Sequence, residues 1–224
     1  MKIKQHLPSI FTLINLFLGF LAIINTMAGD YVVACYIILA AGAFDSVDGK
    51  IARLIGISTN FGKEIDSLAD MVSFCLAPSI LVYSLYTQNM PGISGELIAC
   101  APLIMGAIRL ARFNTDVGDE NSAYFTGLPT PMNALSIASL VLFIEHFKID
   151  NPEYSQPRLL LPLILSLSYL MVSRVYYAKF PHLNFNSGKQ NTLRLLGIVL
   201  FGITFISAIF FGYPYRVLAG FVSF

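Results

Sequence analysis

Four aspartates stand close together in a sequence that is otherwise strongly apolar. Asp45 and Asp48 are three residues apart, and Asp66 and Asp70 are four residues apart. On a helix, either spacing puts both side chains on one face, with Cβ atoms about 5–6 Å apart. Each pair can therefore hold one side of a cation site. Four converging carboxylates without a cation would repel one another strongly in an apolar setting.

The residues around the aspartates indicate which cation and which ligand would bind. Carboxylate oxygens with no His or Cys among them favour Mg²⁺, Mn²⁺ or Ca²⁺ over zinc or copper. Small residues beside the acids leave room for a bulky phosphate ligand next to the ion. These small residues are Gly49, Ala52 and Gly62. Arg53 and Lys63 add positive charge at the rim, which suits a pyrophosphate.

Two other interpretations of the acids stay open at this point. The acids could belong to an ordinary loop and pair with the neighbouring Lys50, Arg53 and Lys63. They could also form the ion site of a cation transporter. A transporter would carry polar residues through the whole bilayer, whereas these acids stop at one end of their apolar segments.

The composition defines the class of protein that must position these residues. Of 224 residues, 56% are hydrophobic and only 12% are charged, which is too apolar for a soluble protein. Apolar runs of about 20 residues, each long enough to cross a hydrocarbon core of about 30 Å, recur along the chain. We therefore expect an all-α, polytopic membrane protein with one domain over residues 1–224. A formal net charge of +1 without a dense basic run gives no reason to expect a nucleic-acid partner.

We predict about eight spans, within a range of six to eight, separated by linkers that are polar or contain Gly or Pro. The basic start of the chain resembles a signal peptide, but no small-residue cleavage site follows, so we interpret it as a retained first span. The predicted spans lie near residues 10–27, 31–53, 62–86, 94–112, 130–147, 158–177, 193–211 and 214–224.

The basic residues predict the orientation of these spans. If the N-terminus is cytoplasmic, only Lys148, Arg158 and Arg216 of the 14 Lys and Arg residues fall outside. The positive-inside rule selects this orientation. It places the aspartates at the cytoplasmic face, and the linker of about eight residues between their two helices makes those helices antiparallel neighbours.

The segment from Asp45 to Asp70 fits the pattern D-x-x-D-G-x-x-A-R-x8-G-x3-D-x3-D without a gap. In this respect the chain resembles the CDP-alcohol phosphotransferases. The resemblance implies a homodimeric, helical membrane enzyme that moves a phosphatidyl or related group from a CDP-activated lipid to an alcohol and releases CMP.

Within that family, longer stretches resemble the bacterial and archaeal phosphatidylserine synthases. The stretches are LP and TxxN near the N-terminus, FGKEIDSLADMVSF at 61–74, RLARFN at 109–114 and FTGLPTP at 125–131. They imply CDP-diacylglycerol and L-serine as substrates, in the cytoplasmic membrane of a prokaryote with the active site facing the cytoplasm. Glycerol 3-phosphate, inositol, inositol phosphate and choline stay open as alternative acceptors.

The resemblance also assigns a role to each acid. Asp45, Asp48, Asp66 and Asp70 are carried over as ligands of a divalent cation, and Asp70 is also the expected general base. The positions expected nearest the CDP-lipid are Asp48, Gly49, Ala52, Arg53 and Gly62, with Thr12 and Asn15 on the first span. For Thr12 and Asn15, packing between helices is an equally good explanation.

The acceptor must be recognised through its carboxylate and ammonium groups. Arg109 and Arg112, three residues apart, would form a fork for a carboxylate or a phosphate, although anchoring by the positive-inside rule competes with this role. The further candidates for polar contacts are Glu64, Ser67 and Ser73.

Overall fold

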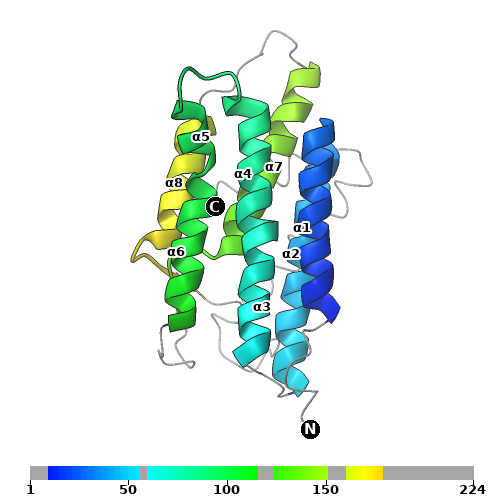
Figure 1. The fold of residues 1–224 in the computed structure, drawn as a ribbon, viewed down its shortest axis with the longest axis vertical. Coiled ribbons are helices and arrows are strands. Elements are labelled where there is room, and N and C mark those ends of the chain that lie inside the picture. Colours follow the sequence, from blue (N-terminus) through cyan, green and yellow to red (C-terminus); the bar gives the residue numbers. More distant parts are fainter. Residues whose placement is uncertain (1–9, 56–59, 116–123, 151–159, 179–224) are drawn as a thin grey trace.

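A computed structural model of the chain describes residues 10–55, 60–115, 124–150 and 160–178. The described part is a bundle of upright helices that lie side by side (Figure 1). The helices are α1 (Ile10–Ala28), α2 (Tyr31–Ile55), α3 (Asn60–Asp70), α4 (Ala77–Val82), α5 (Ser94–Ala99), α6 (Ala101–Thr115), α7 (Thr130–Asp150) and α8 (Leu160–Val172). Two π-helical segments, η2 (Met71–Leu76) and η3 (Tyr83–Thr87), lie on either side of α4.

Apolar helices of membrane-spanning length dominate the bundle. Within the part of the chain that the structure describes, four are long and apolar enough to cross a membrane: Ile10–Ala28, Phe61–Thr87, Ser94–Thr115 and Thr130–Lys148. Two shorter apolar helices, Tyr31–Ser46 and Leu160–Val172, accompany them. Helices therefore occur at the first six predicted positions, as expected of an integral membrane protein. The last two predicted spans, 193–211 and 214–224, lie outside the described residues.

The third predicted span is one continuous helical segment whose winding changes just after the last aspartate. Asp70 ends α3, and the next residue begins the wider π-helical turns of η2. Pro78 follows in the first turn of α4 and has no amide hydrogen to donate to a preceding turn. Such π segments are frequent at functional sites because they change the direction in which side chains project.

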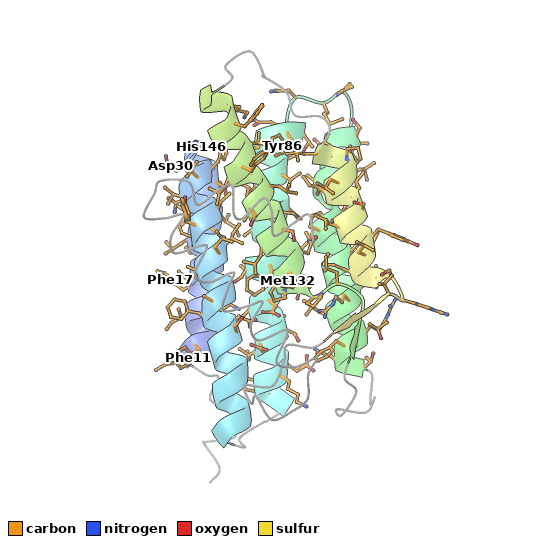
Figure 2. All side chains as sticks on the ribbon, turned by 180° about the vertical axis from the view of Figure 1, so that it is seen from behind. Phe11, Phe17, Asp30, Tyr86, Met132 and His146 are labelled. Atoms are coloured by element: carbon orange, nitrogen blue, oxygen red, sulfur yellow. The ribbon has the colours of Figure 1, made fainter. Side chains whose placement is uncertain are left out.

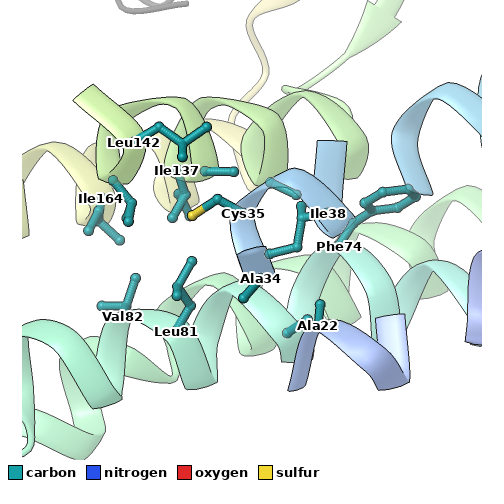
Figure 3. Close-up of a cluster of buried hydrophobic side chains, with 14 of the residues drawn as sticks. Ala22, Ala34, Cys35, Ile38, Phe74, Leu81, Val82, Ile137, Leu142 and Ile164 are labelled. Atoms are coloured by element: carbon teal, nitrogen blue, oxygen red, sulfur yellow. The ribbon is translucent and has the colours of Figure 1, made fainter. Parts of the chain in front are cut away.

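Several helices contribute to one apolar core. Figure 3 shows Ile38 from α2, Phe74 from η2 and Ile137 from α7 in the same cluster, with Ile164 of α8 nearby. All four are almost completely inaccessible. Small residues such as Ala22 lie in the same cluster, and small side chains let helix backbones approach closely where lipid offers no hydrophobic driving force.

A short strand pair accompanies the helices of this all-helical bundle. Strand β1 (Tyr124–Thr126) pairs antiparallel with β2 (Tyr176–Ala178). The predicted sixth span, 158–177, is therefore wrong at its end, because α8 stops at Val172. The backbone of Gly127 donates to the Val175 carbonyl at 2.8 Å, so the segment after α8 is held in a sheet-like pairing with the segment before α7.

The two ends of the bundle can be identified in Figure 2. Asp30, Tyr86 and His146 lie toward one end, and Phe11 lies toward the other. Met132, near the start of α7, lies at about the height of Phe17 on α1. The start of α7 is therefore nearer to the end where α1 begins, which is also where α2 finishes (Figure 1).

We expect Gly127→Ala to destabilise the fold. Gly127 has a φ of +78°, and a Cβ there would run into the Met171 carbonyl oxygen and lie 3.1 Å from its carbon. Left-handed backbone costs an L-residue about 1–2 kcal/mol, and overpacking about 1–3 kcal/mol more. Thermal unfolding in detergent should show a markedly lower midpoint for Gly127→Ala than for Thr126→Ala, the exposed neighbour. Equal midpoints would contradict the close approach.

Candidate active site

Three of the four aspartates come together between α2 and α3. Asp45 projects from α2, and Asp66 and Asp70 project from α3. One carboxylate oxygen from each lies within 4.8 Å of the others, and all three side chains are half-buried. The structure therefore brings Asp45 of one acidic helix against Asp66 and Asp70 of the other, while the predicted contribution of the Asp48 side chain lies outside the described residues.

This cluster can hold a metal ion. Three carboxylates so close together would repel one another, more strongly than in water because the surroundings are partly apolar. Their oxygen atoms are hard ligands of the kind that Mg²⁺, Mn²⁺ and Ca²⁺ prefer. An acidic trio of this geometry fits a divalent cation.

Asp70 is also held from α1. Asn15 donates a hydrogen bond from Nδ2 to Oδ1 of Asp70 at 3.3 Å, and Asn15 itself is only 1% exposed. The backbone of α1 is fixed beside it, because the Ser73 hydroxyl donates to the Asn15 carbonyl at 2.8 Å. Ser73 is completely buried, so its hydroxyl serves the contact between α1 and η2.

Glycine makes this contact between α1 and η2 possible. A Cβ at Gly19 would overlap the Ser73 hydroxyl and would lie 2.7 Å from the Ser73 Cα. A larger residue would push α1 away from η2. Gly19 therefore sets the distance at which Asn15 can reach Asp70.

Arg109 reaches the same region from α6. Its guanidinium interacts electrostatically with Asp70 and with the Cys75 side chain. Gly106, one turn earlier, has room only for hydrogen, because a Cβ there would overlap the Cys75 sulfur. The Nε of Arg109 is buried and has no hydrogen-bond partner among the described residues. A buried, cationic donor beside the carboxylates is available to a ligand.

Arg112 lies in a different environment from Arg109. It is exposed, and its Nη1 donates to the Val172 carbonyl at the end of α8 at 3.2 Å. A basic side chain at that position satisfies a carbonyl that the last turn of a helix leaves without a partner. The two arginines therefore do not form one fork in this structure.

The remaining polar candidates on α3 join it to α6. The Ser67 hydroxyl donates to Oδ1 of Asn114 at 3.1 Å, and Nδ2 of Asn114 donates to Glu64 at 3.2 Å. Asn114 was not among the predicted site residues. Its position in the RLARFN stretch, directly after the two arginines, was the available signal.

Other predicted site residues are only partly described. The side chains of Asp48, Gly49, Ala52 and Arg53 lie outside the described residues, although their backbone belongs to α2. Gly62 lies on α3, and Thr12 is buried on α1 one turn before Asn15. Their roles stay predictions.

The family comparison supports the motif. A family model described as CDP-alcohol phosphatidyltransferase matches residues 5–177. That range includes every element that contributes to the carboxylate cluster.

Relatives over most of the chain carry consistent names. A CDP-diacylglycerol–serine O-phosphatidyltransferase from Helicobacter pylori is 35% identical over 205 residues, which cover 91% of this chain and 81% of the relative. The Bacillus subtilis protein of the same name is 34% identical, over 84% of this chain and 99% of its own length. An archaetidylserine synthase from Methanothermobacter thermautotrophicus is 34% identical over 77% of this chain and 70% of its own.

We expect a divalent cation to stabilise the protein through the acidic trio. Adding Mg²⁺ or Mn²⁺ should raise the thermal midpoint of the wild type, because the ion binds the folded state. Asp66→Asn should reduce this gain strongly, while in a chelator the same variant should unfold at a higher temperature than the wild type, since one repelling charge is gone. Asp30→Asn, an exposed acid near the far end of the bundle, should change neither result. A cation response that Asp66→Asn leaves intact would place the ion elsewhere.

Proposed function

Since this chain belongs to the CDP-alcohol phosphatidyltransferase family, we propose that it transfers the phosphatidyl group of CDP-diacylglycerol to the hydroxyl of L-serine. The products are phosphatidylserine and CMP. The observation that carries the chemistry is the meeting of Asp45, Asp66 and Asp70 at one point between two apolar helices. Serine as acceptor is supported by the names of relatives that match most of the chain.

A divalent cation, Mg²⁺, Mn²⁺ or Ca²⁺, would be held by Asp45, Asp66 and Asp70, with Asp48 as the predicted fourth ligand. When bound, it supplies charge neutralisation for the pyrophosphate and for the phosphoryl group in transfer. The predicted CDP contacts, Gly49, Ala52, Arg53 and Gly62, follow Asp48 or precede Asp66 in sequence, and Thr12 lies one turn before Asn15 on α1.

Asp70 accepts the proton of the serine hydroxyl. The serine oxygen then forms a bond to the phosphorus that bears diacylglycerol, and the bond from that phosphorus to the CMP oxygen breaks. CMP leaves with the electron pair. The hydrogen bond from Asn15 at 3.3 Å orients the Asp70 carboxylate for this task.

Arg109 is the stronger candidate of the two arginines for binding the acceptor carboxylate or a phosphate. It is half-buried, its Nε is available, and it interacts with Asp70. Arg112 is exposed and bound to the end of α8. Glu64 and Ser67 are linked through Asn114, so the three can contribute to the acceptor site only as a group.

The chain forms one membrane domain, in the cytoplasmic membrane of a prokaryote, with the aspartates facing the cytoplasm. The distribution of Lys and Arg supports this orientation. A homodimer is proposed on the family resemblance.

Purified protein given CDP-diacylglycerol, L-serine and Mg²⁺ or Mn²⁺ should release CMP and form phosphatidylserine, and a chelator should stop the reaction. Asp70→Asn should lower turnover about 100-fold or more, because the proton acceptor is lost, whereas Asp30→Asn should retain wild-type turnover. CMP release driven by glycerol 3-phosphate, inositol, inositol phosphate or choline, and not by serine, would refute the serine assignment. Absence of release with any alcohol from folded protein would refute the transferase proposal.

The two arginines should separate in kinetics. Arg109→Met removes a half-buried cation near the acceptor and should raise the KM for serine or CDP-diacylglycerol about tenfold or more. Arg112→Met breaks only the contact with Val172 and should lower the thermal midpoint with both KM values unchanged. The reverse pattern would show that Arg112 binds substrate.

A further inference from the structure

Two buried polar side chains at the start of α7 have no role in the mechanism described so far. Asn133 is completely buried, and Thr130, one turn earlier, is 1% exposed. Neither amide atom of Asn133 nor the hydroxyl of Thr130 has a hydrogen-bond partner within the described ranges. Burying such groups without partners costs about 1–3 kcal/mol each, and native structures rarely keep them without a reason.

These side chains lie on the face of α7 that looks into the bundle. Thr130, Asn133 and Ile137 are spaced three and four residues apart, so they follow one stripe of the helix. Ile137 belongs to the core cluster with Ile38 and Phe74 (Figure 3). Asn133 precedes Ile137 by about one turn of α7. In the same way, Asp70 precedes Phe74 by about one turn of the continuous segment formed by α3 and η2. The polar pair therefore continues the core layer toward the carboxylates.

Contacts between neighbouring helices place Thr130 close to Gly106, one turn before Arg109 on α6, and close to Cys75 of η2. The position of a Cβ on Gly106 would be 3.8 Å from the Thr130 methyl group and in contact with the Cys75 sulfur. Arg109, one turn after Gly106, interacts with Asp70 and Cys75. Leu135 of α7 also packs against α2. A Cβ placed on Gly42, one turn before Asp45, would lie 3.1 Å from a methyl carbon of Leu135. Figure 2 shows Met132, near the start of α7, at about the height of Phe17 on α1.

We propose that Asn133 and Thr130 bind the ammonium and carboxylate groups of the amino-acid acceptor. The Asn133 amide offers one acceptor and two donor hydrogens, and the Thr130 hydroxyl can donate or accept. With the Nε–H of Arg109, they provide the donors that a carboxylate needs and an acceptor for the ammonium group. An acceptor alcohol that lacks the ammonium or the carboxylate group would leave some of these donors and acceptors without a hydrogen-bond partner. A site with buried polar groups discriminates strongly against substrates that leave those groups unpaired.

The inference rests on the proposed serine transfer, and Asn133→Leu tests it separately. Leucine fills a similar volume without polar atoms, so we expect the thermal midpoint of the variant to stay the same or rise. The KM for L-serine should rise about tenfold to a hundredfold, with the KM for CDP-diacylglycerol within about twofold of the wild type. Added L-serine should raise the thermal midpoint of the wild type and not that of the variant.

Thr130→Val, which removes a hydroxyl at nearly constant shape, should act in the same direction and decides the matter if Asn133→Leu does not fold. The matched controls are Thr26→Val and Asn25→Leu, because the side chains of Thr26 and Asn25 donate within their own helix to Ala22 and Leu21; both should keep the wild-type KM for serine.

An unchanged KM for serine in both test variants, or an equal rise in the KM for both substrates, would overturn the inference. If the wild type does not use serine in this assay, the proposed function itself is refuted. If the wild type uses serine and both variants have the same KM for serine as the wild type, only the role of Asn133 and Thr130 is refuted.

Discussion

Mutual repulsion among carboxylates is the constraint on which the rest of the structure depends. Asp45, Asp66 and Asp70 meet within 4.8 Å in a bundle of apolar helices, where charge is costly to bury. Such a site persists only if the helices around it hold it together and supply compensating groups. Asn15 donates to Asp70 from α1, and Arg109 brings a positive charge from α6. The two acidic helices and both of these neighbours therefore act as one unit.

Close approach of backbones is what lets these neighbours reach the acids. Gly19 brings α1 against Ser73, and Gly106 brings α6 against Cys75. Ser73 and Cys75 both belong to the π-helical segment that begins directly after Asp70. The widened turns thus form the surface against which α1 and α6 are set. Packing of small residues, which drives helix association in a membrane, also fixes the geometry around Asp70.

The buried polar groups of α7 differ from those of α1, because the described residues offer them no hydrogen-bond partner. Asn133 and Thr130 lower the stability of the bundle, because they lose their bonds to water and gain none from the described residues. The nearby apolar core of Ile38, Phe74 and Ile137 compensates for that loss. Binding sites often carry such a stability cost, because ligand contacts replace the missing partners.

The amino-acid sequence by itself determined the membrane class, the positions of the first six helices and the convergence of Asp45, Asp66 and Asp70, because hydrophobic length and helical spacing are local properties. It did not determine the partners of those acids. Arg109 and Arg112 look equivalent in sequence, yet Arg109 interacts electrostatically with Asp70, whereas Arg112 donates to a carbonyl at the end of α8. The end of α8 and the pairing of β1 with β2 were likewise decided by tertiary contacts. Those contacts join residues far apart in the chain, and no local pattern encodes which side of a helix meets which neighbour.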